Sequence, residues 1–222
     1  MSSSQLIRLS GLALMLGCVL FVIAGLIQMY LLFNPSSYVA VVGFVGLITL
    51  VAGPLVVLGL IGVCARQLEV AGILGLIAFV MAFFGSAFVF GVYWYNTFVV
   101  PSIAPVDLRS FMYFEIARPP LYAGSLILTY ELQYLGWLLI GVASLRARLF
   151  PRLAVVLLIF VSLAGGIVSA VQPVGGLPDF RSVMSYASVF VTMLFYAIIA
   201  RLGYTLWTGG SASEDLTRKP GL

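Results

Sequence analysis

The sequence predicts an all-α polytopic integral membrane protein with six transmembrane helices and one short extracytoplasmic interfacial helix. Hydrophobic residues occupy 63% of the 222 positions and charged residues only 8%, whereas an ordinary soluble domain is about half apolar and about a quarter charged. The apolar residues form six stretches, each reaching the roughly 20 residues that a helix needs to cross a bilayer core. Strands are excluded because the alternating pattern of a membrane barrel is absent and lipid cannot satisfy open backbone groups.

The first predicted span, residues 9–33, is a membrane helix and not a cleaved signal peptide. Its apolar run is longer than the roughly 7–15 residues of a signal-peptide core, and no small-residue cleavage site ends it. A polar turn at residues 34–37 contains Pro35, which stops one helix, and serines that can cap the next. The second span, residues 38–63, contains Pro54 near its middle, and a proline inside a helix predicts a kink.

The third span, residues 70–99, carries aromatic side chains along its outer half. They are Phe83, Phe84, Phe88, Phe90, Tyr93, Trp94, Tyr95 and Phe98. Tryptophan and tyrosine favour the membrane interface, whereas the deeper phenylalanines wrap around the helix. We therefore expect some of these rings to face lipid and others to face neighbouring helices. A site for a flat apolar ligand, such as a quinone or a carotenoid, is an alternative interpretation of this cluster.

The segment after the third span contains the predicted interfacial helix. Pro101 and Pro105 break the third span, and a Pro-Pro pair at 119–120 precedes the fourth. Between these breaks, Asp107–Ala117 mixes apolar, aromatic and charged residues, which is typical of a helix lying in the plane of the membrane surface. We interpret this helix as a connector on the lipid headgroups. A lid over a cavity or a docking surface is the alternative.

The last three spans cover residues 121–145, 153–174 and 183–206. In the fifth span, Ser162, Gly166 and Ala170 repeat every four residues, a stripe of small residues that allows two helices to approach closely. The six spans form one domain over residues 1–207. The Gly- and Ser-rich residues 208–222 predict a disordered cytoplasmic tail.

The basic residues predict that both termini are cytoplasmic. With the N-terminus inside, Arg109, Arg118 and Arg181 lie outside, and the other eight of the 11 lysines and arginines lie in cytoplasmic segments. These eight are Arg8, Arg66, Arg146, Arg148, Arg152, Arg201, Arg218 and Lys219. The bias follows the positive-inside rule and explains the net charge of +4 without a nucleic-acid partner. We expect a multi-pass protein of a prokaryotic plasma (inner) membrane, with the lipid bilayer as its main partner.

The chain lacks the residues that most enzyme chemistry requires. It contains no histidine, which excludes a histidine-ligated haem, the familiar zinc protease motifs and a Ser-His-Asp triad. The single lysine, Lys219, lies in the tail and cannot form a retinal Schiff base within the bundle. Cys18 and Cys64 match no metal motif, and we interpret them as small apolar packing residues. The sequence therefore predicts a protein that is not an enzyme and that carries no metal or cofactor.

Glu131 is the one acidic residue deep inside a predicted span. It lies ten residues after the start of the fourth span and fourteen before its end, which is about 15 and 21 Å at 1.5 Å per residue. An acid at that depth is costly, so the carboxyl group should face the bundle and stay neutral unless water or a cation reaches it. We expect hydroxyl partners for it in a polar cavity: Tyr134 one turn on, and a polar face of the sixth span formed by Ser185, Ser188, Thr192 and Tyr196.

The sequence is compatible with two functions. The first is a non-enzymatic accessory or structural subunit of a membrane complex, or a binder of an apolar ligand, in which protonated Glu131 holds two helices together by a hydrogen bond. The second is a small proton-coupled permease, in which Glu131 gains and loses a proton. The partners expected beside lipid are thus other membrane subunits or an apolar ligand.

Overall fold

The structure is a computed structural model that describes residues 3–33, 38–99, 102, 120–171 and 178–217. All regular structure within these ranges is helical: α1 (Ser3–Phe33), α2 (Tyr38–Trp94), the π-helix η2 (Tyr95–Val99), α5 (Pro120–Ala147), α6 (Arg152–Val171) and α7 (Pro178–Thr217). Six helical segments in the described chain are long and apolar enough to cross a membrane. The prediction of six such helices is confirmed. The predicted interfacial helix, Asp107–Ala117, lies outside the described residues.

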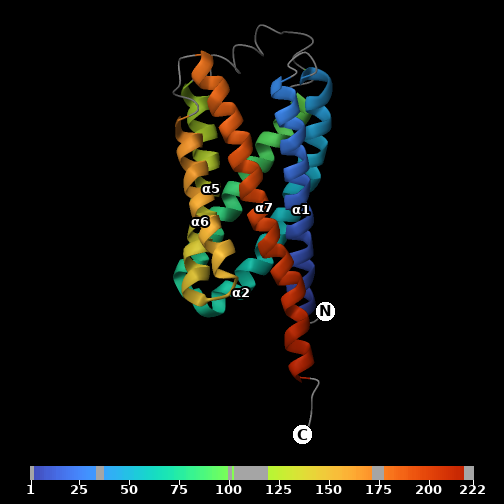
Figure 1. Ribbon diagram of the computed structural model, residues 1–222, viewed down its shortest axis with the longest axis vertical. Helices are drawn as coiled ribbons and strands as arrows, with labels where there is room; N and C mark the ends of the chain where they lie inside the picture. The colour runs from blue at the N-terminus through green and yellow to red at the C-terminus, as the bar shows by residue number, and fades with distance from the viewer. Residues whose placement is uncertain (1–2, 34–37, 100–101, 103–119, 172–177, 218–222) are drawn as a thin grey trace.

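Two of the six spans belong to α2, which reverses direction at Gly72. The first arm of α2 contains the span Gly43–Gln67, and the second arm, with η2, contains the span Ala71–Val99. Gly72 has φ 55° and ψ −136°, a conformation that is readily accessible only without a Cβ atom. The glycine therefore permits a tight reversal, and the two arms run side by side in opposite directions (Figure 1).

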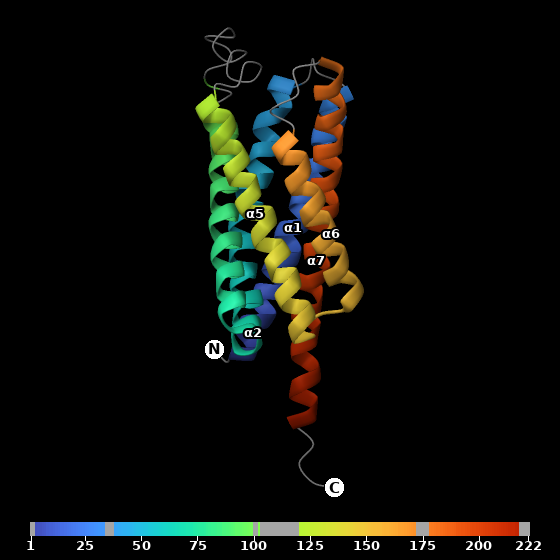
Figure 2. The ribbon, with the colours of Figure 1, turned by 90° about the vertical axis from the view of Figure 1, so that its left-hand side faces the viewer.

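The spans form a ring in chain order. α1 packs between the first arm of α2 and α7, while α5 packs between the second arm of α2 and α6. The ring closes between α7 and α1, whereas α6 and α7 make the least extensive of these interfaces. Figure 2 shows α5 and α6 side by side, and α1 begins and α7 ends at one end of the bundle. α1 and α6 end, and α2 and α7 begin, at the other end. We call these ends the terminal end and the loop end.

The half of the bundle nearer the terminal end is filled by a continuous apolar core. Its fully buried members include Leu14, Leu60, Trp137, Leu202 and Leu206. Glycines bring the helices together there; Gly136 of α5, for example, lies against the backbone of Ala82 on α2. Such close contact matters in lipid, because apolar burial alone gives little drive for helix association.

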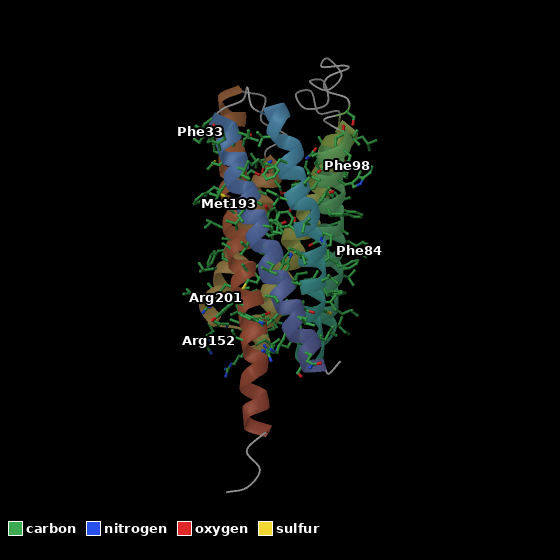
Figure 3. All side chains as sticks on the ribbon, turned by 90° about the vertical axis from the view of Figure 1, so that its right-hand side faces the viewer. Phe33, Phe84, Phe98, Arg152, Met193 and Arg201 are labelled. Carbon is green, nitrogen blue, oxygen red and sulfur yellow. The ribbon has the colours of Figure 1, made fainter. Side chains whose placement is uncertain are left out.

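The outer surface of the bundle is strongly apolar. Large side chains such as Leu26, Phe44 and Ile73 are more than half exposed, and in water they would form an unusually extended apolar surface. Phe84 and Phe98 project outward from α2 and η2 (Figure 3), whereas Phe83 packs against the core. The aromatic run of the third span thus faces both outward and inward, as predicted.

Basic residues gather at the terminal end. Arg152 and Arg201 lie toward it (Figure 3), as does Arg146 in the last turn of α5. α7 continues through Thr217 and extends past the rest of the bundle (Figure 1). Its last turns include residues 208–217, which the sequence assigned to the tail. Residues 218–222 lie outside the described chain, and the disordered tail stays a prediction.

Candidate functional site

A cavity of about 480 Å³ lies between the helices in the half of the bundle nearer the loop end. It extends from Leu32 of α1 to Gln133 of α5 and Tyr196 of α7, near the middle of the bundle. Below this depth the apolar core fills the interior. The polar side chains of the described lining are uncharged: Gln28, Thr49, Tyr93, Asn96, Tyr130, Gln133, Tyr134, Ser169, Ser185, Ser188, Thr192 and Tyr196.

The predicted polar face of the sixth span lines this cavity. Ser185, Ser188, Thr192 and Tyr196 of α7 all belong to the lining, together with Tyr134 of α5. Their spacing of three or four residues places the α7 side chains on one face of the helix, and that face is turned inward. The structure therefore brings together five of the six residues that the sequence singled out.

Two hydrogen bonds join α5 to α7 at the inner end of the cavity. The Gln133 amide Nε2 donates to the Tyr196 hydroxyl at 3.0 Å. The hydroxyl groups of Tyr134 and Thr192 are 3.1 Å apart, and either can be the donor. Hydrogen bonds between membrane helices add stability and set the rotation of each helix. They hold the polar faces of α5 and α7 opposite each other.

Aromatic rings build the same inner end. The rings of Phe21 and Tyr196 are stacked, with centroids 4.2 Å apart and planes 8° from parallel. Phe195 meets Tyr134 edge to face at 5.0 Å. Aromatic pairs in these geometries stabilise packing beyond the area that they bury. The inner end of the cavity is thus closed by rings that pack against one another.

Glu131 does not meet the partners that the sequence predicted. Its carboxyl oxygen Oε1 accepts a hydrogen bond of 2.6 Å from Ser169 Oγ of α6, and the residue is half-buried. The side chains of Glu131 and Tyr134 diverge by about 60° around α5 because they are three residues apart. Tyr134 therefore reaches Thr192 on α7, whereas Glu131 turns toward α6 and lies outside the described cavity lining.

Two adjacent glycines of α6 make room for these two side chains. A Cβ atom at Gly165 would run into the ring of Tyr134, and a Cβ at Gly166 would lie 3.1 Å from Glu131 Oε2. Any larger residue at Gly165 would push α6 away from α5. Of the stripe Ser162, Gly166 and Ala170 predicted on the fifth span, Gly166 lies against Glu131 of α5 and Ser162 is buried, whereas Ala170 is exposed.

Four lining residues present polar groups that have no hydrogen-bond partner within the described chain. They are Gln28 of α1, Tyr93 of α2, Asn96 of η2 and Ser188 of α7. Two are carboxamides and two are hydroxyls, and each of these groups can both donate and accept. Polar groups facing the interior of a membrane bundle are costly unless water or a ligand satisfies them. The site thus presents unused hydrogen-bonding capacity from three sides.

The π-helix η2 places Asn96 in the lining. Thr97, the next residue, is buried and donates from Oγ1 to the carbonyl oxygen of Tyr93 at 2.7 Å. It also packs tightly against Gly46 of the first arm of α2. Single π-helical turns occur frequently at functional sites, because the wider turn changes which side chains face inward.

Sequence reasoning did not single out Asn96, Tyr93 or Ser169 as site residues. The sequence does mark Asn96 as unusual, since this amide directly follows the aromatic run Tyr93-Trp94-Tyr95 in an otherwise apolar span. Ser169 lies three residues after Gly166 and therefore shares a helix face with the stripe of small residues. Tyr93 was assigned to the membrane interface, and only the arrangement of the helices shows that it lines the cavity.

Compared with known proteins, the chain matches no family model, no curated protein and no solved structure.

Proposed function

We propose that this chain is a non-enzymatic multi-pass membrane protein that binds a small uncharged ligand in the cavity between its helices. The observation that carries the proposal is the lining of the cavity, which combines hydroxyl groups, carboxamides and aromatic rings without a charged side chain among the described residues. A volume of about 480 Å³ falls in the range of small-molecule sites, roughly 300–1,000 Å³.

The lining favours a ligand with hydrogen-bonding groups over the purely apolar ligand that the sequence suggested. An apolar molecule would cover the half-buried Asn96 and Ser188 without pairing their polar groups, and an unsatisfied buried polar group costs about 1–3 kcal/mol. An ionic molecule would place its charge beside uncharged groups in a poorly polarisable region. A neutral, partly polar ligand avoids both costs.

The position of the cavity supports access from the loop end. The apolar core closes the terminal end with fully buried residues such as Leu14 and Leu206. We place the protein in a prokaryotic plasma membrane with both termini cytoplasmic, supported by the basic residues at the terminal end. In this orientation the cavity receives its ligand from the extracytoplasmic side.

Native mass spectrometry of the purified protein tests the proposal. The wild-type protein should retain a small molecule in addition to lipid, and Ser188→Phe, which fills part of the cavity, should lose it. Ser86→Ala is the matched control, because Ser86 is buried without a hydrogen-bond partner in the described chain and does not line the cavity. Equal retention in the wild type and Ser188→Phe would show that the molecule binds elsewhere.

A proton-coupled permease is the second candidate, and one contact favours it. Ser169 is bonded to Glu131 and also lines the cavity, so the carboxyl group is one hydrogen bond away from a bound ligand. In proteoliposomes, ligand uptake coupled to proton movement should then disappear in Glu131→Gln, while ligand binding persists. Uptake that is unchanged in this variant rules out coupling through Glu131.

A role as an accessory subunit is compatible with the same site. The described chain has little mass outside its helices, and its outward surface is apolar along each face. Such a surface is available to lipid and to the helices of other membrane subunits. If the chain runs in a complex with other membrane proteins on native gels of solubilised membranes, it has protein partners as well as a ligand.

A further inference from the structure

We propose that the ligand of the cavity is a neutral polyhydroxylated group of sugar size, held by the carboxamides of Gln28 and Asn96 and the hydroxyl of Ser188. The inference rests on the proposed function, since it names the chemical class of the ligand for the same cavity. It is carried by the unpartnered polar groups of the lining and by the aromatic ring of Tyr93 beside them.

The lining offers both donors and acceptors of hydrogen bonds, which favours a neutral ligand that can also do both. Gln28 and Asn96 each offer an N–H donor and a carbonyl acceptor, and Ser188 offers a hydroxyl that does both. A quinone has carbonyl acceptors only, so it would leave the acceptors of both carboxamides unsatisfied. A sugar hydroxyl both donates and accepts, and several hydroxyls on one ring can satisfy groups from α1, η2 and α7 at once.

An aromatic ring in the lining matches the apolar C–H face of a sugar. A pyranose ring carries C–H groups on its faces as well as hydroxyls on its rim. Tyr93 is half-buried in the lining, and its ring supplies apolar surface for the C–H face. Phe21 supports this ring from behind, with the two centroids 5.5 Å apart, while Phe21 itself is almost fully buried against Tyr196.

Charged sugars do not fit this site, because the described lining contains no charged residue. A sugar phosphate or an amino sugar needs a counter-charge once it is removed from water, and the described lining provides none. The shared chemistry of the ligand is therefore an uncharged glycosyl group. It can come from a free sugar entering at the loop end or from the headgroup of a neutral glycolipid.

Isothermal titration calorimetry of the full-length protein in a polyoxyethylene detergent tests the inference, because that detergent has no sugar headgroup. The probes are glucose, a glucosyl diacylglycerol, glucose 6-phosphate and a short-chain benzoquinone. We expect binding of glucose, of the glucosyl lipid, or of both, and no binding of the phosphate or the quinone. The relative affinities of the first two probes identify whether the source is a free sugar or a lipid.

Substitutions of the lining residues test whether the glycosyl probe binds in this cavity. Asn96→Leu removes the amide at similar size and should weaken binding of the glycosyl probe about tenfold, because the ligand hydroxyl is left without its partner. Ser188→Ala should weaken it about two- to tenfold and serves as the second variant if Asn96→Leu fails to fold. Ser86→Ala should bind as the wild type does.

The outcomes separate the two proposals. Binding of the quinone without either glycosyl probe overturns the inference on ligand class but supports a ligand-binding cavity. Equal binding of glucose and glucose 6-phosphate also overturns it. If no probe binds and native mass spectrometry finds no retained molecule, both proposals fail. Unchanged affinity in Asn96→Leu and Ser188→Ala would place glycosyl binding outside this cavity and overturn the inference.

Discussion

Ser169 on α6 donates a hydrogen bond to Glu131 on α5 and also lies within reach of a second acceptor. Ser169 Oγ lies 2.6 Å from Glu131 Oε1 and 2.9 Å from the carbonyl oxygen of Gly166. The single hydrogen of the serine hydroxyl can point to the carboxyl oxygen or lie between the two acceptors as a three-centre bond. The contact links α5 to α6 directly beside the cavity, since Ser169 also belongs to the lining.

We predict that the hydrogen bond from Ser169 perturbs the carboxyl group of Glu131. Infrared difference spectroscopy between the wild type and Glu131→Gln should identify the carboxyl bands of Glu131. These bands should shift in Ser169→Ala, which removes the hydrogen-bond partner. Bands that keep their frequency in Ser169→Ala would contradict the contact.

The stability of the bundle should depend on the hydrogen bond at Glu131 and not on its acidity. Glu131→Gln keeps an oxygen that accepts the hydrogen bond from Ser169 and should leave thermal stability nearly unchanged. Glu131→Leu and Ser169→Ala should each cost about 0.5–2 kcal/mol. In a double-mutant cycle the two changes should be non-additive, because each removes the same bond. Additive effects would show that the bond contributes nothing.

Gly165 should be intolerant of substitution because the ring of Tyr134 occupies the space of its missing side chain. Gly165→Leu should separate α5 from α6 and cost about 1–3 kcal/mol or more, as overpacking does. Gly124→Ala is the control, since a Cβ atom there meets nothing within 4 Å, and it should be neutral or stabilising by up to about 1 kcal/mol. Thermal unfolding in detergent measures both. Equal tolerance at the two positions would refute the α5–α6 packing.

Gln67 should tolerate an apolar residue better than an acid. It is fully buried in α2, and its Nε2 donates to the Ile140 carbonyl at 3.0 Å and to Ser144 Oγ at 2.6 Å, both on α5. Gln67→Glu replaces the donor by an acceptor facing that carbonyl and should cost at least about 2 kcal/mol. Gln67→Leu also removes the Oε1 atom, which has no partner in the described chain, and should cost less. The reverse order of the two melting temperatures would contradict this contact.

Both termini should face the cytoplasm. α1 begins and α7 ends at the same end of the bundle, so the two termini must share one side of any membrane that the six helices cross. Alkaline phosphatase fused after Gly221 should be inactive, while phosphatase inserted between residues 100 and 120 should be active, because the enzyme needs an extracytoplasmic environment. Activity at Gly221 would reverse the orientation and place the mouth of the cavity on the cytoplasmic side.

The sequence by itself determined the features that depend on local pattern. Apolar length predicted six membrane-length helices, because crossing a hydrocarbon core sets a minimum length. The spacing of Ser185, Ser188, Thr192 and Tyr196 predicted a shared face, because the helical period is constant. The depth of Glu131 followed from counting residues along the fourth span. None of these inferences required knowing which helices are neighbours.

Only the tertiary structure decided what these faces meet. Glu131 bonds to Ser169 and not to the hydroxyls of α7 because the rotation of α5, set by Gly165 and Gly166 on α6, turns the carboxyl group that way. The cavity likewise combines Gln28 and Asn96, which lie in separate spans and share no sequence pattern. The physical reason is that lipid solvates every apolar face equally well, so helix rotation is chosen by close packing and by a few hydrogen bonds between helices.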